Sequence, residues 1–364
     1  MSDLLLEEEA PPPRRRGHGG TVVAVVVLAV LALLAVVGVK AVLPRLGGPA
    51  PDYDGSGTGE VTVQVANGAT ISDIGQTLQT AGVVKSAKAF REAARKDDRS
   101  LRIQPGYYKL KLQMKASVAL ALLLDPASRL RSRVTVREGL TVDQTLQAIA
   151  KNVSDVPLAS LREAAKNTAA LGLPEWAGGR LEGFLFPATY DIEPGTSAVE
   201  VLRTLVDEAL ERFERLDLEG RAAALKIKPY EALVIASLVE GETGKASDRG
   251  KVARVVYNRL AKPMRLQFDS TVKYAYALRG VTKTRLLYRD LDIVSPYNTY
   301  RVDGLPPAPI NSPGEAALEA ALVPTPGPWL YFVVIDKDGN SAFAVTAEEF
   351  ARLKERYRQE VLTP

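Results

Sequence analysis

The chain has 364 residues, 46% of them hydrophobic and 25% charged, so it can form a full core and has room for two domains. Its net charge of +4 is too small to indicate a nucleic-acid partner. The absence of cysteine excludes disulfides, thiol nucleophiles and thiolate metal sites. The single histidine, His18, precedes the first apolar segment, which excludes Ser-His-Asp, Cys-His and HExxH chemistry from the rest of the chain. We expect no cofactor and no metal, and catalysis by carboxylate, lysine, tyrosine or a serine with another base.

The N-terminal segments predict a membrane anchor. Residues 1–20 are rich in proline, glycine and charge, and we expect a disordered tail. Residues 21–39 contain no charged residue, and as a helix they would span about 28 Å, enough for the apolar core of a bilayer. This run is longer than the apolar part of a cleaved signal peptide, and no small-x-small cleavage site follows it. The sequence therefore predicts a single transmembrane helix at 21–43. The cluster Arg14–Arg16 places the N-terminus in the cytoplasm and the remaining chain outside.

Two stretches of the chain repeat one another approximately, after a Pro/Gly/Ser linker at 44–59. The stretches 61–78 and 134–149 each read as an alternating strand, a glycine turn, a threonine and an amphipathic helix. The two threonines are placed as helix N-caps in capping boxes, Thr70 with Asp73 and Thr141 with Gln144. A further helix is expected after each copy. We therefore treat 60–178 as one region built from these strand–helix units.

The other predicted elements mix strands and helices without a βαβ repeat, which indicates an α+β fold. They are a strand at 105–114, an amphipathic helix at 194–216, a buried strand at 329–335, a turn at 336–340, a returning strand at 341–346 and a closing helix from 347. The last two strands are expected to pair as a hairpin.

The stretch 229–269 contains the most informative residue, Glu240. Residues 229–240 read as a helix that is apolar on almost every face, as in a buried helix. A carboxylate at the end of such a helix is partly desolvated, which raises its pKa toward the value that a general acid needs. The alternative, a last-turn glutamate that faces water, stays open at this point. A glycine-containing break, a second helix and a short strand-like segment with Gln267 and Asp269 are expected to follow.

Six blocks of this sequence resemble one known family. They are LEGFLFPATYDI at 181–192, LVEGETG at 238–244, SDRGKVARVVYNRL at 247–260, MRLQFDSTVKYA at 264–275, SPYNTY at 295–300 and GLPPAPINSPG at 304–314. In this order they are similar to the catalytic core of the endolytic murein transglycosylases, the YceG-like family. The resemblance implies a bacterial cell-membrane protein with a LysM-like, glycan-binding region over 60–178 and a lytic transglycosylase domain over 179–364.

The resemblance also implies a mechanism and partners. Glu240 matches the family's catalytic acid, which protonates the glycosidic oxygen between N-acetylmuramic acid and N-acetylglucosamine. As a carboxylate it then takes the proton of the C6 hydroxyl, which closes onto C1 and leaves a 1,6-anhydro end. The implied role is to terminate the elongation of nascent glycan strands. The implied partners are peptidoglycan glycan strands and the peptidoglycan synthases of the membrane.

Several residues are candidates for supporting or substrate-binding roles. Tyr297, Asn298 and Tyr300 offer hydroxyl, amide and ring faces that suit sugars and N-acetyl groups, or they form only a turn. The remaining candidates are polar residues near the same blocks. Gln267 and Asp269 could orient Glu240 or the sugar. Glu182 could be a partner of Glu240 or a buried charge at a helix start, and Glu242 could be a second carboxylate. Glu242 would pair with Glu240 only if the helix ended at Gly241, because residues two apart on a helix point apart.

Three alternatives accompany this interpretation. Ser270 and Lys273 fit S-x-x-K, the acylation motif of penicillin-binding proteins, although no K-T-G or S-D-N motif accompanies it. A cell-wall peptidase with a Ser–Lys dyad is therefore one alternative. A second is a non-catalytic glycan-binding protein in which Glu240 is structural. A third concerns only 60–178, which could be a scaffold that positions the catalytic domain.

Overall fold

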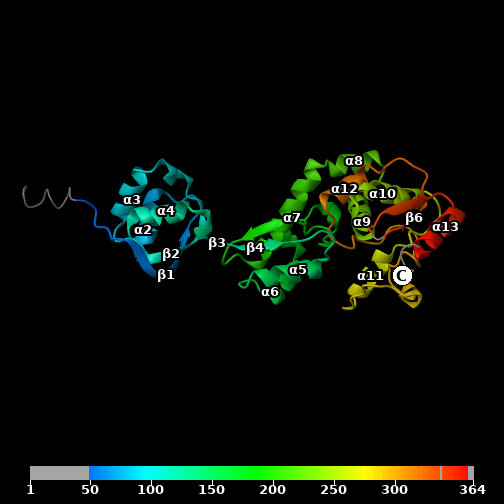
Figure 1. The fold of residues 1–364 in the computed structure, drawn as a ribbon, viewed down its shortest axis with the longest axis horizontal. Coiled ribbons are helices and arrows are strands. Elements are labelled where there is room, and N and C mark those ends of the chain that lie inside the picture. The colour runs from blue at the N-terminus through cyan, green and yellow to red at the C-terminus, as the bar shows by residue number, and fades with distance from the viewer. Residues whose placement is uncertain (1–48, 337, 360–364) are drawn as a thin grey trace, which may run out of the picture. The chain divides into compact units, whose positions relative to one another are not determined.

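The computed structural model describes residues 49–336 and 338–359, which form two compact units, one ending at Arg129 and the other beginning at Leu130 (Figure 1). The predicted tail at 1–20, the predicted transmembrane helix at 21–43 and the first residues of the predicted linker lie outside the described residues. Among the residues that are described, none of the helices is both long and apolar enough to span a bilayer.

The first unit packs three helices against a small antiparallel sheet. Its elements are β1 (Ser56–Val65), α2 (Ile71–Thr80), α3 (Ala87–Arg95), β2 (Gly106–Met114), α4 (Ala116–Leu124) and, at the boundary, β3 (Arg129–Leu130). The strand order is β1-β2-β3, and Val63 of β1 lies opposite Tyr108 of β2. Leu78, Phe90 and Leu110 are fully buried in its core. The predicted first copy of the repeat is confirmed, including the capping box of Thr70.

Two details of this unit differ from expectation. The linker predicted to reach residue 59 gives way to β1 at Ser56, because Ser56 and Thr58 pair with Met114 and Leu112 of β2. The helix α4 was not predicted. Its sequence ASVALALLL is apolar without a helical period, so the pattern carries no sign of the buried face that it presents to the core.

The second unit mixes one buried helix with other helices and two small two-stranded antiparallel sheets, which confirms the α+β class. Its strands are β4 (Ser132–Thr135), β5 (Thr189–Ile192), β6 (Tyr331–Val334) and β7 (Ser341–Ala344). Its helices are α5 (Val142–Asn152), α6 (Leu158–Lys166), α7 (Ala198–Arg215), α8 (Leu218–Ala224), α9 (Pro229–Glu242), α10 (Ala246–Leu260), α11 (Asp269–Ala277), α12 (Glu315–Leu322) and α13 (Ala347–Tyr357). The predicted hairpin is formed by β6 and β7, although β6 is half-buried rather than buried.

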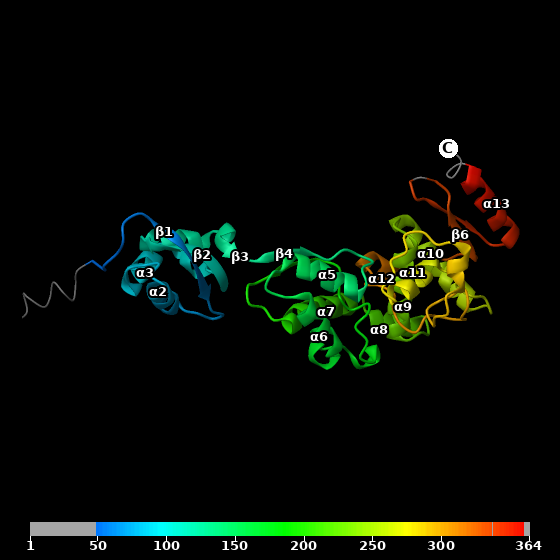
Figure 2. The ribbon, with the colours of Figure 1, turned by 90° about the horizontal axis from the view of Figure 1, so that it is seen from below.

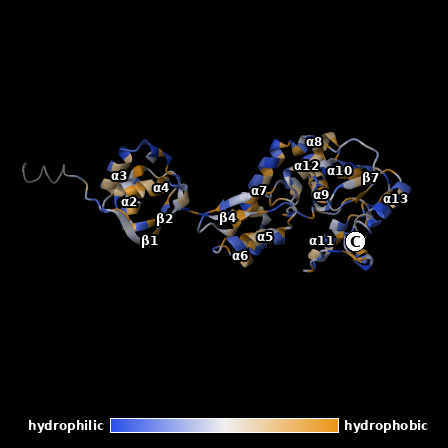
Figure 3. Cartoon of the chain, in the orientation of Figure 1, coloured by the Kyte–Doolittle hydropathy of each residue, from blue (hydrophilic) through white to orange (hydrophobic). Residues whose placement is uncertain are grey.

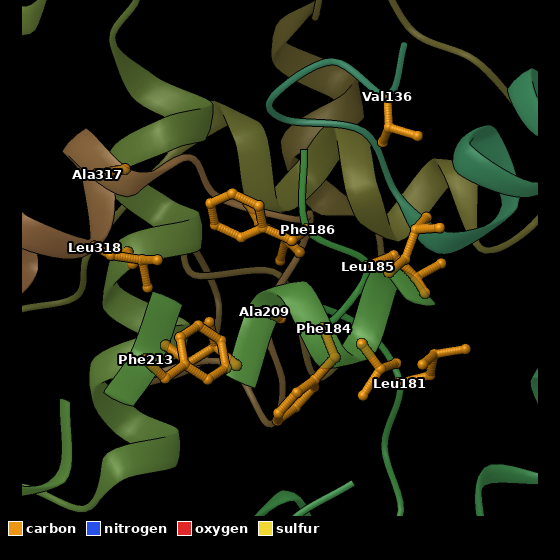
Figure 4. Close-up of a cluster of buried hydrophobic side chains, with 14 of the residues drawn as sticks. Val136, Leu181, Phe184, Leu185, Phe186, Ala209, Phe213, Ala317 and Leu318 are labelled. Atoms are coloured by element: carbon orange, nitrogen blue, oxygen red, sulfur yellow. The ribbon is translucent and has the colours of Figure 1, made fainter. Parts of the chain in front are cut away.

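The second copy of the repeat belongs to this unit and not to the first. Its strand β4 pairs with β5, with Val134 opposite Tyr190. Its side chains share one core with the blocks further along the chain, and Figure 4 shows Val136 in the same cluster as Phe184 and Leu318. The packing therefore divides at 129/130 and not at the expected boundary of 178/179. The LysM-like character of 60–178 stays a prediction.

Helix α9 lies at the centre of the second unit. Every residue from Ala232 to Val239 is buried. The helix packs against α8, α10, α11 and α12 (Figures 1 and 2), and most of it carries the hydrophobic colour in Figure 3. The all-round burial that its sequence predicts is confirmed. The helix continues through Gly241 to Glu242, so the expected break begins only at Thr243.

The segment expected to be strand-like after the second helix is irregular, and Asp269 is the first residue of α11. Gln267, two residues before Asp269, has a left-handed backbone, with φ at +50°. The backbone N–H of Gln267 donates to the carbonyl of Thr299 at 3.1 Å, a single contact and not a ladder of strand hydrogen bonds.

Gly183 allows a close contact that the fold of this unit requires, and its substitution tests the fold. Its φ is +91°, and a Cβ there would lie 2.9 Å from Pro309 Cγ and 3.1 Å from Leu233 Cδ2. Gly172 has a similar φ of +75° but nothing within 4 Å of such a Cβ. We expect Gly172→Ala to lower the free energy of unfolding by about 1 kcal/mol. Gly183→Ala should lower it by a further ~1–3 kcal/mol, because Pro309 and Leu233 must move. Urea denaturation of both variants measures the difference, and equal losses would contradict the packing described here.

Candidate active site

Glu240 lies in the last turn of α9 with its side chain only 7% exposed. Each carboxylate oxygen has one donor. The backbone N–H of Gly314 donates to Oε2 at 3.2 Å, and Nη2 of Arg249 on α10 donates to Oε1 at 3.3 Å. The alternative in which Glu240 faces water is therefore wrong.

Burial raises the pKa of Glu240 above its ordinary value. The N–H of Gly314 and the guanidinium of Arg249 favour the charged form and oppose this rise, while the carboxylate of Glu138 adds to it. The net direction is upward, as the apolar helix predicts. The carboxyl group of Glu240 therefore keeps its proton to a higher pH than an exposed glutamate does.

Arg249 contacts a second carboxylate besides Glu240. The same Nη2 atom lies 3.4 Å from Oε2 of Glu138, which follows β4 in the second copy of the repeat. The side chain of Arg249 is 11% exposed and that of Glu138 is 48% exposed. Sequence reasoning missed both residues. Arg249 lies inside a block that carries the family resemblance, whereas Glu138 was assigned to a separate region.

Glycines let the backbone approach these side chains closely. Gly139, with φ at +75°, lies against Glu240, so that a Cβ there would be 3.7 Å from Glu240 Cγ. A Cβ at Gly314 would collide with Oε1 of Glu138. The segments carrying these glycines are joined by two hydrogen bonds, from the Gly139 N–H to the Ser312 carbonyl and from the Ser312 N–H to the Leu140 carbonyl, each of 2.9 Å.

A cleft of about 230 Å³ opens near the C-terminal end of α9, and Glu240 itself is not among the residues that line it. Its wall includes Gly139 and Gly241, the two glycines adjacent to Glu240 in space and in sequence. The remainder is lined by the apolar Ala277 and Ile310 and by polar and aromatic side chains from α5, α11 and the loops: Thr141, Gln144, Ser270, Lys273, Tyr274, Thr282, Lys283 and Asn311. The second copy of the repeat thus contributes part of the wall.

Glu242 does not pair with Glu240. Because α9 continues to Glu242, the two side chains point apart. Glu242 instead accepts a hydrogen bond from the Ser270 N–H at 3.0 Å. Burial raises the pKa of Glu242 to about 7, and the nearby Asp269 carboxylate adds to this while Lys273 opposes it. The second carboxylate expected from the sequence is therefore present but turned toward α11.

Glu182 ties three segments together. Its Oε1 accepts from the Val142 N–H at 3.0 Å and its Oε2 from the Tyr274 hydroxyl at 2.9 Å. Burial raises the pKa of Glu182 to about 7, against the effect of these donors. Glu182 therefore holds α5 and α11, which carry cleft residues, and has no hydrogen bond to Glu240.

Gln267, Asp269 and Tyr300 make no hydrogen bond to the carboxylate of Glu240 in the described part of the chain. Asp269 is exposed and accepts a hydrogen bond from the Tyr300 hydroxyl at 2.7 Å. Gln267 is exposed. Among the described residues, no hydrogen bond or ion pair joins Gln267 or Asp269 to Glu240, whose polar partners are Arg249 and Gly314. The structure does not bring the predicted orienting groups to the carboxylate.

Asn298 holds a turn and offers nothing to a ligand. It is fully buried, its Nδ2 donates to the carbonyls of Leu291 and Ile293 at 2.8 Å each, and its Oδ1 accepts from the Tyr300 N–H at 3.0 Å. The prediction of substrate binding by Asn298 is not supported, because all three hydrogen bonds are internal. The half-buried Tyr297 packs edge-on against Tyr274, with ring centroids 4.9 Å apart.

The Ser–Lys dyad of the peptidase alternative is not assembled. Ser270 packs against Gly241, where a Cβ would come within 2.8 Å of Ser270 Cβ. In the described part of the chain the Ser270 hydroxyl has no hydrogen-bond partner, so it is not joined to Lys273. Within residues 49–336 and 338–359, no group of three or more histidine, cysteine or acidic side chains is arranged to hold a metal ion.

A partly desolvated carboxyl group on a buried helix of an α+β unit, with the adjacent Gly241 in the wall of a cleft, is the arrangement of an enzyme that uses a carboxylate for acid–base catalysis. The chain belongs to the YceG-like family, whose sequence profile matches residues 63–356.

Two curated relatives are named endolytic murein transglycosylase. The protein of Bacillus subtilis strain 168 is 34% identical over 311 residues, which cover 82% of this chain and 84% of the relative. The protein of Streptococcus pneumoniae D39 is 33% identical over 321 residues, which cover 80% of this chain but only 57% of that longer protein. A crystal structure described as a yceG-like protein from Listeria monocytogenes matches with a TM-score of 0.56 and 28% identity, over 81% of this chain and 98% of that one.

The raised pKa of Glu242 predicts a pH-dependent gain in stability on substitution. The folded-state value of about 7 exceeds the ordinary value of 4.5, so wild-type stability is lost as the pH rises from 4.5 through about 7. Glu242→Gln keeps an acceptor for the Ser270 N–H and removes this loss. We expect the free energy of unfolding of Glu242→Gln to exceed that of the wild type by ~1–3 kcal/mol at mildly alkaline pH. At acid pH the two values should be nearly equal.

Chemical denaturation at the two pH values measures the effect. Glu163→Gln is the control, because that side chain is 77% exposed and its replacement should change little at either pH. A stability difference between Glu242→Gln and wild type that does not change with pH would contradict the assignment.

Proposed function

We propose that this protein is a peptidoglycan lytic transglycosylase, a lyase that cleaves the bond between N-acetylmuramic acid and N-acetylglucosamine and leaves 1,6-anhydro ends. The observation that carries the proposal is the environment of Glu240, which is 7% exposed, with burial favouring its protonated form and with its neighbours Gly139 and Gly241 in the wall of a cleft. The names of the two curated relatives support the same substrate and reaction. Because the protein is a lyase in this proposal, no water molecule is consumed.

In the first step the protonated carboxyl of Glu240 gives its proton to the glycosidic oxygen as the bond from that oxygen to C1 breaks. In the second step the C6 hydroxyl oxygen of the same N-acetylmuramic acid bonds to C1 and its proton passes to Glu240. The carboxyl group is thereby restored. The nucleophile belongs to the substrate, so its proximity replaces a second catalytic carboxylate.

The hydrogen bonds of Glu240 suit both steps. The N–H of Gly314 and the guanidinium of Arg249 stabilise the carboxylate that the first step creates. Burial favours the neutral acid that the second step restores. The two effects oppose one another, as suits a group that must both give and take a proton.

Glu240→Gln tests the chemistry directly. The amide keeps the shape of the side chain but cannot transfer the proton, so we expect release of anhydro ends to fall by about 10²–10⁴-fold or more. Mass spectrometry of digested glycan strands measures these ends, and a melting curve confirms that the variant is folded. Glu242→Gln is the matched control, since it removes a carboxyl two residues away on the same helix, and it should keep activity within about tenfold.

The reverse pattern, with Glu242→Gln inactive and Glu240→Gln active, would move the acid to Glu242. A folded Glu240→Gln variant that releases anhydro ends at the wild-type rate would refute the proposed mechanism. If the wild type leaves strand length unchanged, the protein is a glycan-binding protein and not an enzyme.

We also propose that residues 21–43 anchor the protein in the bacterial cell membrane with the N-terminus in the cytoplasm. The uncharged run and the preceding arginine cluster support this orientation. The site would then face the peptidoglycan, near the synthases whose nascent strands it would terminate, and the 60–178 region would add glycan contacts.

A topology reporter checks this orientation. An alkaline phosphatase fused after Pro364 folds only outside the cytoplasm, so the fusion should be active. The same fusion with Arg14–Arg16 replaced by glutamates should lose part of that activity, because the charge bias that orients the helix is removed. An inactive but stably produced wild-type fusion would contradict the proposed topology.

A further inference from the structure

Two carboxylates on separate elements share a single guanidinium. Arg249 Nη2 lies 3.3 Å from Glu240 Oε1 and 3.4 Å from Glu138 Oε2. The groups that act on Glu240 come from three elements. They are Arg249 from α10, Glu138 from the segment after β4, and the Gly314 N–H from the segment before α12.

The charged groups of α11 face a different carboxylate. Asp269 and Lys273 act on Glu242, at the very end of α9, and not on Glu240. Among the described residues, Arg249 and Glu138 are therefore the charged side chains that set the electrostatic environment of Glu240.

The position of Glu138 is fixed by the backbone on both sides of it. The Val136 N–H donates to the Ala188 carbonyl and the Gly139 N–H to the Ser312 carbonyl, each at 2.9 Å. The Glu138 side chain lies over Gly314, the residue whose N–H also holds Glu240. A change in the charge of Glu138 is thus expected to act on Glu240 at a constant geometry.

We propose that Glu138 is a positioning residue of the reaction, which holds Arg249 between the two carboxylates and keeps its charge compensated in both protonation states of Glu240. While Glu240 is a neutral acid, Glu138 neutralises the 11% exposed guanidinium. After Glu240 has given its proton, Arg249 neutralises Glu240, and the half-exposed Glu138 is solvated by water. The proposal rests on Glu240 being the acid of the proposed function.

The proposal predicts opposite effects for the two partners of Glu240. Glu138→Gln leaves Arg249 to pair with Glu240 alone, which favours the carboxylate and lowers the pKa of Glu240. Because the acid must be protonated to react, the alkaline limb of the kcat/KM profile should move to lower pH, by about 0.5–1 pH unit for a partly exposed charge. Arg249→Gln removes the cation and should move the same limb to higher pH.

The test uses the full chain and two readouts. The first is kcat/KM for anhydro-end release from purified glycan strands, measured across the acid-to-alkaline range. The second is the titration midpoint of the Glu240 carboxyl by carbon-13 NMR, assigned with Glu240→Gln, which needs no turnover. Asp143→Asn is the matched control, because Asp143 lies five residues further on, is 55% exposed and pairs with Arg162.

The expected result is a lower midpoint in Glu138→Gln, a higher one in Arg249→Gln and the wild-type value in Asp143→Asn. Glu138→Asp keeps the charge and should return the midpoint toward wild type. An unmoved midpoint in folded Glu138→Gln, a shift in the same direction for Glu138→Gln and Arg249→Gln, or a Glu138→Asp variant that behaves like Glu138→Gln would overturn the proposal. If the wild type makes no anhydro ends, the proposed function fails, while the NMR titration still decides the role of Glu138.

Discussion

The site depends on the desolvation of one carboxyl group, Glu240, at the end of a helix that has no exposed face. An apolar environment by itself shifts such a group toward its neutral form. The guanidinium of Arg249 and the N–H of Gly314 oppose this shift by stabilising the carboxylate. The balance needs three contributions at once: the burial provided by α9, the guanidinium provided by α10, and the Gly314 N–H provided by the segment before α12. The packing of the second unit can be understood as the means of bringing them together.

Small residues make that convergence possible. Ser237 in the middle of α9 binds the 310–311 segment twice: its Oγ accepts from the Ile310 N–H at 3.1 Å and its carbonyl from Asn311 Nδ2 at 3.0 Å. This fixes the segment that leads to Gly314. Gly241 and Gly139 then allow α11 and the turn after β4 to approach the same end of α9. A side chain at Gly241 would have to displace Ser270, and one at Gly139 would be strained by the positive φ of +75°.

The organisation of the unit changes how the strand–helix repeat is understood. Its second copy shares a core with α9 and supplies the residues after β4 that line the cleft and reach Arg249. It is therefore part of the candidate active site, whatever the first copy contributes to glycan binding. A scaffold that only positions a separate catalytic domain would not place a carboxylate on the guanidinium that holds the acid.

The sequence by itself determined the α+β class, the capping boxes of Thr70 and Thr141, the burial of α9 and the identity of Glu240 as the group to explain. These follow from local patterns, namely hydrophobic period, cap spacing and a charge within an apolar run, together with blocks that resemble a family. Only the tertiary structure decided the partners of Glu240, because Glu138, Arg249 and Gly314 are far apart in the chain and no local pattern relates them. It also decided against Asn298 and against the pairing of Glu242 with Glu240. The reason is the same in both cases: where a polar side chain points depends on whether a helix continues and on which backbone groups it meets, and this is settled by packing between distant segments.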